Sequence, residues 1–495
     1  MKWKSGEKLS LWLGLVVLGA AALGLRCLHL EDRPMHTDEA VHAVILGEML
    51  ESGVYHYNPH DSHGPTLYYL SYPILRTLGV HDLKEMEAWH LRLISALIGT
   101  TTLLLLALWA KELGTGAVIA AATLFALAAP FVYYQRYFIH EGLFVLLILL
   151  LLRCLWSWYS NSHSIRPAII TGIVTALLFA TKETSPLVII ALALAACGLW
   201  LMQKNRTEFT HPFLKEIGWA FFAFVLVFML FYSSFGTNLH GFIDFFSAQL
   251  RFVHRAGGEG HEKPWWTYLS WLLMPNFYTM PWSGLIIFGL AAFGAIRCWK
   301  QLLVRFLFFF TLALGMIYSV IPYKTPWLEI DLLAPAILLA GVGANAIFQV
   351  TERFRFVFIL TTALVFLGLG RETWQTCFAH AADARNPLAY SPTAGDIDQL
   401  VTRIGQLQKT YPHDSANIVQ VISTDYWPLP WYLRRLQPVG YWNTIPENIT
   451  GDILVTSPDL LPALQSKIGP EWKIDYFGLR ADVLAIVLSR PGPHE

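Results

Sequence analysis

Histidines and carboxylates gather in one short stretch near the start of this sequence. They are His36, Asp38, Glu39, His42, His56, His60, Asp61 and His63. Side chains of these types act as general acids and bases, bind phosphate or hold metal ions. Packing of an apolar protein requires no such cluster, because charged side chains are rarely buried without a partner. The segment 31–88 that contains them is therefore the first candidate for a reaction site.

The segment 36–53, HTDEAVHAVILGEMLESG, has the spacing of an amphipathic helix. The apolar positions that can share one face of this helix are Ala40, Ala43, Val44, Gly47 and Leu50. The pattern predicts a helix that lies on a membrane surface, with Asp38 and Glu39 in its first turn. Two interpretations of Asp38 stay open, because a carboxylate at a helix N-terminus either caps the helix or does chemistry.

The composition argues against most soluble classes of protein. Of the 495 residues, 55% are hydrophobic and 14% are charged, whereas soluble domains carry about 25% charged residues. Lys and Arg total 35 against 35 Asp and Glu, and without a long basic run the chain is not expected to bind nucleic acid. Five dispersed cysteines without a CxxC pair argue against a disulfide framework or a cysteine zinc site. A polytopic membrane protein remains.

Apolar segments long enough to cross a bilayer recur along the first 370 residues. A membrane-spanning helix needs about 20 apolar residues, and we predict about eleven such spans. They are 10–29, 89–110, 114–132, 141–158, 167–181, 185–202, 216–235, 283–298, 303–321, 328–349 and 356–370. The tryptophan-rich segment 265–282 is predicted to be a further span or an interfacial helix. The first span lacks a small-residue cleavage site and is predicted to be retained.

Lysine and arginine predict the orientation, because they favour the cytoplasmic ends of spans. The N-terminus reads MKWKSGEK, and connections on the same side carry further basic residues. They are Lys111, Arg166, Lys204, Arg206, Lys215, Arg297, Lys300, Arg305, Arg353 and Arg355. We therefore predict a cytoplasmic N-terminus. The segment 31–88 and the C-terminal tail then lie outside the cytoplasm, which in a bacterium is the periplasmic face of the inner membrane.

The tail, residues 371–495, differs from the rest because it is polar and has the patterns of a soluble domain. The predicted elements are buried strands at 418–423 and 452–457, helices at 429–436 and 458–468, and a closing hairpin at 472–490. About 125 residues suffice to bury a core. We predict two parts: a transmembrane domain over 1–370, with 31–88 as its catalytic outer loop, and an extracytoplasmic α/β domain over 371–495.

An ordered set of short motifs resembles a known class of membrane enzymes. Asp38 and Glu39 are followed by HDSHGPTLYYL (60–70), and WHLRLISALIGTTTLLLL (89–106) places an Arg just inside the second span. This succession resembles the GT-C glycosyltransferases, which include the protein O-mannosyltransferases and the aminoarabinose transferase that modifies lipid A. Those families have an Asp-Glu pair and then a His-Pro-Pro or Lys-Pro-Pro segment. The chain departs from that pattern at Gly64, which stands in place of the first Pro.

Three later segments extend this resemblance over nearly the whole chain. YYQRYFIHEGLFVLL (133–147) matches the second outer loop, with Arg136 present and Glu141 where Asp is usual. ATKETSPLVI (180–189) and VIPYKTPWLEIDLLAP (320–335) resemble a Lys-containing segment and a late loop that faces the donor. YKTPW (323–327) and DYWPLPWYLRR (425–435) resemble a narrower bacterial and archaeal family of flippase-associated proteins.

The resemblance implies a GT-C fold of about eleven membrane helices and transfer of sugar from a polyprenyl-phosphate donor. It implies a single displacement with inversion, for which we assign Asp38 as general base. Glu39 would orient the acceptor or the loop, or raise the pKa of Asp38. The residues expected to bind the donor phosphate are Arg136, Lys182, Lys324 and His63. Those expected to bind the substrates are Tyr68, Glu141, Tyr323 and Trp327.

Simpler interpretations compete with these roles. Lys182 and Lys324 could snorkel to the interface, and Tyr323 and Trp327 could belong to an aromatic belt. If the phosphate assignment holds, Asp38, Arg136, Lys182 and Lys324 converge on one cavity.

No cofactor is assigned with certainty. His60, Asp61 and His63 could hold a divalent metal such as zinc, but we favour a hydrogen bond from His63 to phosphate or a role in positioning the loop. The expected partners are the lipid-linked donor, an acceptor that is lipid, protein or glycan, and the bilayer. The alternatives are a flippase or transporter component for lipid-linked sugars and an assembly protein that binds glycan without catalysis. A flippase would place its charges near the bilayer midplane.

Overall fold

A computed structural model of the chain describes residues 5–60, 63–161, 164–202, 214–258, 261–350, 355–411, 419–436 and 438–491. Up to residue 379 the regular elements are helices. The longer ones are α1 (Ser5–Cys27), α2 (Thr37–Ser52), α3 (Thr66–Thr77), α4 (Ala88–Leu105), α6 (Thr115–Leu127), α8 (Glu141–Ser160), α9 (Ile165–Phe179), α10 (Ser185–Met202), α11 (Leu214–Tyr232), α12 (Gly241–Arg255), α14 (Trp282–Arg297), α15 (Leu302–Val320), α16 (Glu329–Val350) and α17 (Arg355–Trp374). Short pieces extend or join them: η1 (Leu106–Trp109), α5 (Ala110–Leu113), α7 (Ala129–Tyr134), α13 (Thr267–Leu273), η3 (Pro326–Leu328) and the π-helix η5 (Gln375–Ala379).

Each predicted span coincides with a helix or a continuous run of helices in these described ranges. Seven of the described helices are long and apolar enough to cross a membrane, and α6, α9 and α14 are apolar but shorter. The segment 265–282 contains only the seven-residue helix α13, which is too short to span a bilayer. The fold class expected from the sequence is therefore confirmed. The domain boundary at residue 370 stays a prediction, and α17 continues past it to Trp374.

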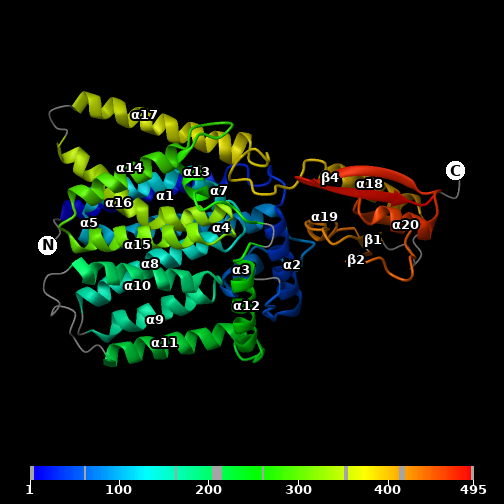
Figure 1. Cartoon of the computed structure of the whole chain (residues 1–495), viewed down its shortest axis with the longest axis horizontal. Helices are drawn as coiled ribbons and strands as arrows, with labels where there is room; N and C mark the ends of the chain where they lie inside the picture. Colours follow the sequence, from blue (N-terminus) through cyan, green and yellow to red (C-terminus); the bar gives the residue numbers. More distant parts are fainter. Residues whose placement is uncertain are drawn as a thin grey trace.

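Three shorter helices lie across one end of the bundle. α2, α3 and α12 cross the direction of the long helices there, next to the C-terminal sheet (Figure 1). Helix α1 begins at the opposite end of the bundle (Figure 1). We call the end of the bundle that carries α2, α3 and α12 the α2 end. Lys182 and Thr325, the neighbour of Lys324, line the same cavity as Asp38, so both lysines lie near this end.

The apolar face of α2 is turned into the protein. Ala40, Ala43, Gly47 and Leu50 are buried, and a Cβ on Gly47 would lie 2.7 Å from Cβ of Leu83. The helix was predicted correctly, but the prediction that this face lies against a membrane was wrong. The residues that pack against it come from distant parts of the chain, which the local pattern does not show.

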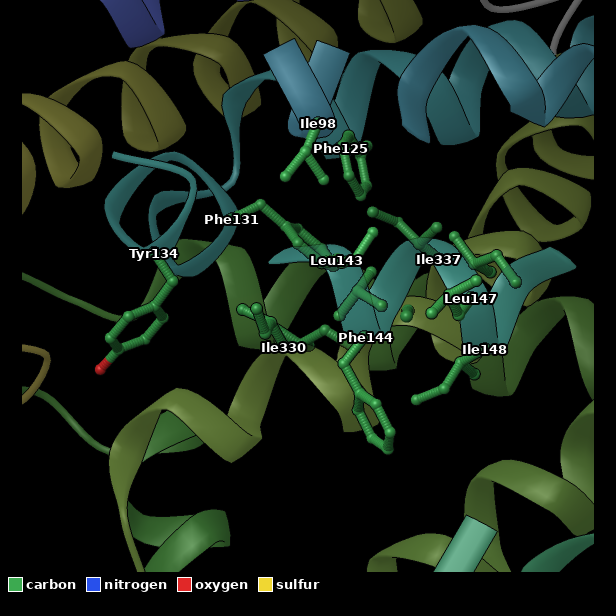
Figure 2. Close-up of a cluster of buried hydrophobic side chains, with 14 of the residues drawn as sticks. Ile98, Phe125, Phe131, Tyr134, Leu143, Phe144, Leu147, Ile148, Ile330 and Ile337 are labelled. Carbon is green, nitrogen blue, oxygen red and sulfur yellow. The ribbon is translucent and has the colours of Figure 1, made fainter. Parts of the chain in front are cut away.

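Large side chains from α4, α6, α7, α8 and α16 fill the core of the bundle. Figure 2 shows Phe125, Phe131, Phe144 and Ile337 within this cluster, and all four are fully buried. Elsewhere small residues bring helices together. A Cβ on Gly343 of α16 would lie 2.0 Å from the carbonyl oxygen of Leu290 in α14. Close backbone contact through glycine is typical of helix pairs in membranes.

The C-terminal part is built on a five-stranded sheet with the strand order β2-β1-β3-β5-β4. Its elements are α18 (Ile397–Thr410), β1 (Val419–Ile422), α19 (Leu429–Tyr432), β2 (Val439–Trp442), β3 (Ile453–Thr456), α20 (Leu461–Ile468), β4 (Lys473–Arg480) and β5 (Val483–Ser489). β1 pairs in parallel with β2 and β3, whereas β5 is antiparallel to β3 and β4. β1, β3 and the closing hairpin were predicted, although Ile418 lies outside the described residues. α18 and β2 were not predicted.

Candidate functional site

A cavity of about 380 Å³ opens at the α2 end, within the size range of small-ligand pockets. Its lining comes from α2, α12 and α15, from residues 59–60 and 63, from the connections around 182–184, 261–268 and 321–328, and from the C-terminal part. The chemically active side chains in this lining are His36, Asp38, His42, His60, His63, Lys182, Glu183, Arg251, Arg255, His261, Tyr268, Tyr318, Tyr323, Trp327, Tyr390 and Arg480. Segments far apart in the sequence thus meet at one polar site.

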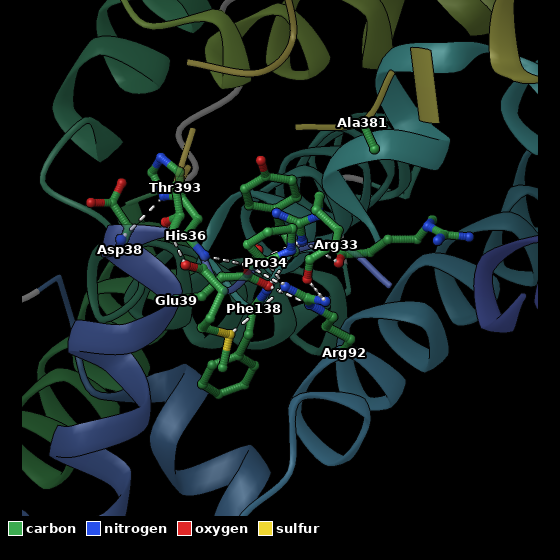
Figure 3. A network of polar contacts seen from close by, with 12 residues as sticks. Arg33, Pro34, His36, Asp38, Glu39, Arg92, Phe138, Ala381 and Thr393 are labelled. Carbon is green, nitrogen blue, oxygen red and sulfur yellow. Dashed lines mark hydrogen bonds and ion pairs between the residues drawn. The ribbon is translucent and has the colours of Figure 1, made fainter. Parts of the chain in front are cut away.

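Asp38 lines this cavity from the first turn of α2. The ring of His36 caps the helix, because its Nδ1 accepts a hydrogen bond from the backbone N–H of Asp38 at 3.1 Å. Among the described residues, no side chain or backbone group bonds to the Asp38 carboxylate. Figure 3 shows this carboxylate pointing away from the neighbouring network. An unpaired carboxylate in a cavity wall can accept a proton from a bound hydroxyl or amine.

Glu39, the next residue, is turned the other way and is fully buried (Figure 3). Arg92 of α4 binds its two oxygens at 3.0 and 2.9 Å, and Arg33 donates to it at 3.1 Å. The backbone N–H groups of Phe138 and His36 also donate to it. Although burial opposes ionisation, Arg33 and Arg92 hold the pKa of Glu39 well below its usual range. Glu39 thus ties the start of α2 to the bundle and does not line the cavity.

Three lining residues, His63, Lys182 and Glu183, take part in two ion pairs. Glu141, a predicted substrate contact, pairs with Lys182 but does not itself line the cavity. Lys182 contacts Glu141 at 2.5 Å, and both side chains are almost completely buried. His63 donates through Nδ1 to Glu183 at 2.6 Å. Burial alone would lower the pKa of His63, but the Glu183 carboxylate outweighs it and raises this pKa. Lys182 and His63 both line the cavity, and each already has a carboxylate partner. Their assignment to the donor phosphate stays a prediction.

His63 stands beside two further imidazoles. The ring centroids of His42 and His140 lie 4.7 Å apart, and His63 lies 5.1 Å from His140. Burial and the neighbouring His63 lower the pKa of His42 to about 3. Tyr68, a predicted substrate contact, is fully buried and does not line the cavity. Its hydroxyl forms a hydrogen bond with Nδ1 of His42 at 2.8 Å.

The turn that carries His63 is packed directly against the end of α9. The N–H groups of Gly64 and Thr66 donate to the carbonyls of Thr181 and Ala180, each at 3.1 Å. A Cβ on Gly64 would lie 2.1 Å from the Ala180 oxygen. A proline would bring a Cβ into the same contact. Glycine in place of the first proline therefore lets the backbone at residue 64 lie against the backbone of Ala180.

Replacing Gly64 by Ala is expected to destabilise the protein by about 1–3 kcal/mol, the usual cost of forcing a side chain into a packed contact. Thermal unfolding of the purified protein in detergent measures this change. Gly370→Ala is the matched control, because a Cβ there meets no atom within 4 Å. Equal unfolding temperatures for the two variants would contradict this account of the turn.

Two predicted phosphate ligands are turned away from the cavity. The Arg136 guanidinium donates to the backbone carbonyls of Leu25, Leu28 and His29, and burial lowers its pKa to about 10. The buried Lys324 ammonium donates to the carbonyls of Ser319, at 2.9 Å, and Ile321. Burial and the charge of Lys263 lower its pKa. Of the four groups expected to converge, Asp38 and Lys182 line the cavity, whereas Arg136 and Lys324 do not.

Arg251 and Arg255, which sequence reasoning missed, line the cavity from α12. They lie one helical turn apart, and Arg251 contacts His60 at 2.6 Å. The opposite face of α12 exposes a stripe of large apolar side chains, Ile243 (59%), Phe246 (52%), Leu250 (74%) and Val253 (70%). This spacing is readable in the sequence as an amphipathic helix with two arginines on its polar side. It was the signal that could have identified these residues.

An aromatic group forms another wall of the cavity. Tyr323 lies 4.9 Å from the ring of His261, and Trp327 lies 5.6 Å from the ring of Tyr390. Tyr390 belongs to the segment after α17 and bonds to His261 through its hydroxyl. Burial, with the nearby Tyr323 and Asp38, raises the pKa of Tyr390 to about 12. Tyr323 and Trp327 therefore line the same cavity as Asp38.

The sequence allows a divalent metal site at His60, Asp61 and His63. Asp61 and Ser62 lie outside the described residues. In the part of the chain that is described, no group of three or more His, Cys, Asp or Glu side chains has the arrangement of a metal site.

No protein-family profile matches the chain, and a search of curated proteins finds no match. Solved structures do match. ArnT from Cupriavidus metallidurans bound to undecaprenyl phosphate has a TM-score of 0.66 at 14% identity, over 96% of this chain and 98% of ArnT. The archaeal oligosaccharyltransferase AglB from Archaeoglobus fulgidus, in complex with an inhibitory peptide and a dolichol-phosphate, has a TM-score of 0.59 at 12% identity, over 92% and 70%. The chain is thus an integral membrane protein with the fold of the GT-C glycosyltransferases.

Proposed function

We propose that this protein is a glycosyltransferase that moves a sugar from a polyprenyl-phosphate carrier to an acceptor at the α2 end. One observation carries the proposal: a single cavity brings the Asp38 carboxylate together with cationic side chains and an aromatic wall. The similar fold of ArnT, solved with undecaprenyl phosphate, supports a lipid-linked donor. The α2 end is then extracytoplasmic, and the predicted setting is the bacterial inner membrane. The acceptor is a lipid, protein or glycan.

Arg251 and Arg255 of α12 are the residues best placed to bind the donor phosphate. Lys182 and His63 already have carboxylate partners at 2.5 and 2.6 Å. Arg251, which contacts the imidazole of His60, and Arg255 both face the cavity from a helix whose opposite side exposes apolar side chains. A helix of this kind can lie in the membrane interface, with its apolar face in the acyl region. It would hold a phosphate at the boundary where the polyprenyl chain enters the bilayer, and guanidinium groups bind phosphate through paired hydrogen bonds.

The reaction would be a single displacement at the anomeric carbon. Asp38 takes the proton from the acceptor hydroxyl or amine as that atom bonds to the anomeric carbon. The bond from this carbon to the bridging oxygen breaks, and that oxygen leaves on the polyprenyl phosphate. The cations stabilise its charge, which is the kind of interaction that favours a transition state. Attack opposite the leaving group inverts the anomeric configuration. Tyr323 and Trp327 would support the sugar ring.

Replacing both Arg251 and Arg255 by Gln is expected to weaken the binding of polyprenyl phosphate by about 10- to 100-fold per arginine, because a charged hydrogen bond contributes about 1.5–3 kcal/mol. Titration of the protein in nanodiscs with polyprenyl phosphate measures the dissociation constant. Arg403→Gln is the matched control, because Arg403 pairs with Asp475 on the C-terminal part and does not line the cavity. Unchanged affinity in the double variant would remove α12 from the donor site.

The proposed activity itself is tested with the purified protein in nanodiscs. It is supplied with polyprenyl-phosphate sugars that differ in the sugar, together with a membrane extract as the source of acceptor. Mass spectrometry follows the release of polyprenyl phosphate and the glycosylated product. The proposal requires both to appear with at least one donor. If the donor stays intact in nanodiscs, but the same protein reconstituted in vesicles moves it across the bilayer, the chain is a flippase component. If it only binds, the chain is an assembly protein.

A further inference from the structure

The buried imidazole of His36 is bonded at both of its ring nitrogens. Nδ1 accepts from the backbone N–H of Asp38 at 3.1 Å, so this nitrogen carries no proton. Nε2 lies 2.8 Å from the carbonyl oxygen of Tyr390. A carbonyl only accepts, so the ring donates through Nε2 and is the neutral Nε2-protonated form. One side chain therefore joins the first turn of α2 to a segment more than three hundred residues later.

Met35, the residue before His36, also contacts the C-terminal part at two places. Thr393 donates through its hydroxyl to the carbonyl of Met35 at 2.7 Å. The Met35 N–H donates to the hydroxyl of Tyr432 in α19, also at 2.7 Å. Thr393 in turn forms an antiparallel bridge with Arg480 at the end of β4. The C-terminal part is thus attached to the residue immediately before His36.

The ring of His36 is also fixed by packing. It lies 5.6 Å from the ring of Tyr137 and 6.3 Å from that of Trp327, and it is 5% exposed. The imidazole is therefore enclosed between two aromatic rings and bonded at both nitrogens, so its position depends on the segment that carries Tyr390. A shift of the segment at Tyr390 would therefore be transmitted to the N–H of Asp38 and to the direction of its carboxylate.

We propose that His36 is a positioning residue that aligns the general base Asp38 only when the segment Leu388–Thr393 is docked. This inference rests on the proposed function, since it takes Asp38 as the base. The C-terminal part then completes the catalytic site. An acceptor or partner that moves the C-terminal part would change the rate of transfer rather than the binding of the donor.

Two conservative substitutions separate the two bonds of His36. The Asn side chain places an oxygen as many bonds from Cβ as Nδ1, and Asn is among the best N-cap residues. His36→Asn keeps the cap and loses the bond to Tyr390. The Gln side chain places its amide nitrogen as many bonds from Cβ as Nε2. His36→Gln keeps the bond to Tyr390 and loses the cap.

The measurements are kcat for transfer, the dissociation constant for polyprenyl phosphate, and amide hydrogen exchange in residues 37–42 and 388–393. For His36→Asn we expect normal protection of 37–42, faster exchange in 388–393 and an unchanged dissociation constant. Its kcat is expected to fall by about 10- to 100-fold, because small displacements of reacting groups cost rates of this order. His36→Gln is expected to show normal exchange in 388–393, faster exchange in 37–42 and a similar fall in kcat.

His81→Asn is the control, because it removes an exposed imidazole that bonds to Arg76 and does not line the cavity. It is expected to behave as wild type. A wild-type kcat in His36→Asn would overturn the inference and leave His36 as a simple helix cap. Unchanged exchange in 388–393 would overturn it too. If the wild type transfers no sugar from any donor, the proposed function fails, and the exchange data alone decide whether α2 and the segment are coupled.

Discussion

Replacing Asp38 by Asn is expected to lower the rate of sugar transfer by about 10²–10⁴-fold, the usual contribution of a general base. Asn has the shape of Asp but cannot take the proton of the acceptor. Because no described residue bonds to the Asp38 carboxylate, the substitution removes no structural contact. The unfolding temperature and the affinity for polyprenyl phosphate are therefore expected to stay as in the wild type. Initial rates of polyprenyl phosphate release, measured with saturating donor, check the prediction.

The matched control for Asp38→Asn is Glu51→Gln, which removes an exposed carboxylate from the far end of the same helix. This variant is expected to transfer sugar at the wild-type rate. If Asp38→Asn forms product as fast as Glu51→Gln does, Asp38 is not the base. The open interpretation from the sequence, in which Asp38 only belongs to the start of a helix, would then be correct.

Replacing the neighbouring Glu39 by Gln is expected to have the opposite profile, with a loss of stability of about 3–5 kcal/mol, as for other broken buried ion pairs. The substitution leaves the buried Arg33 and Arg92 without their shared carboxylate. It also weakens the anchor between α2, α4 and the backbone of Phe138. Thermal or denaturant unfolding in detergent measures the effect. Two adjacent acidic residues are thus expected to separate cleanly into one that affects the rate and one that affects stability.

The pH dependence of stability follows from the same contacts. Because the pKa of Glu39 is lowered by folding, its contribution to stability is fully present above the pKa of the unfolded chain. It is lost as the pH falls below that value toward the folded pKa. Glu39→Gln should therefore lie closest to the wild type in stability under acidic conditions and furthest from it at neutral pH. An equal difference at pH 3 and pH 7, or none at either, would show that the pair does not stabilise the fold as described.

Hydrophobicity was sufficient to predict most of the membrane part. The predicted spans coincide with helices because the bilayer demands long apolar segments whatever their tertiary contacts. The alternation of those spans also placed Lys182 and Lys324 at the same end as Asp38. The polar periodicity of 397–410, which forms α18, was overlooked. The face of α2 could not be assigned from its own pattern, because its packing partners come from distant segments.

The site was predicted less completely, for a physical reason. A basic residue at the end of a span either faces a ligand or donates to free backbone carbonyls, and the sequence does not distinguish these cases. Arg136 and Lys324 donate to backbone carbonyls, whereas Arg251 and Arg255 line the cavity. The Asp-Glu pair shows the same limit, because only the fold places Asp38 in the cavity and Glu39 in the core. The motifs predicted which end of the bundle each residue lies at. They did not predict whether its side chain lines the cavity or is buried in the protein.

The proposed reaction breaks the bond between the sugar and the bridging oxygen of a polyprenyl-phosphate sugar. A donor that carries a heavy-oxygen label at that bridging position tests this step. Mass spectrometry of the products shows where the label goes. We expect all of it on the released polyprenyl phosphate, with unlabelled sugar on the acceptor. Label found in the glycosylated product, or a donor recovered intact after crossing the bilayer, would contradict glycosyl transfer at this site.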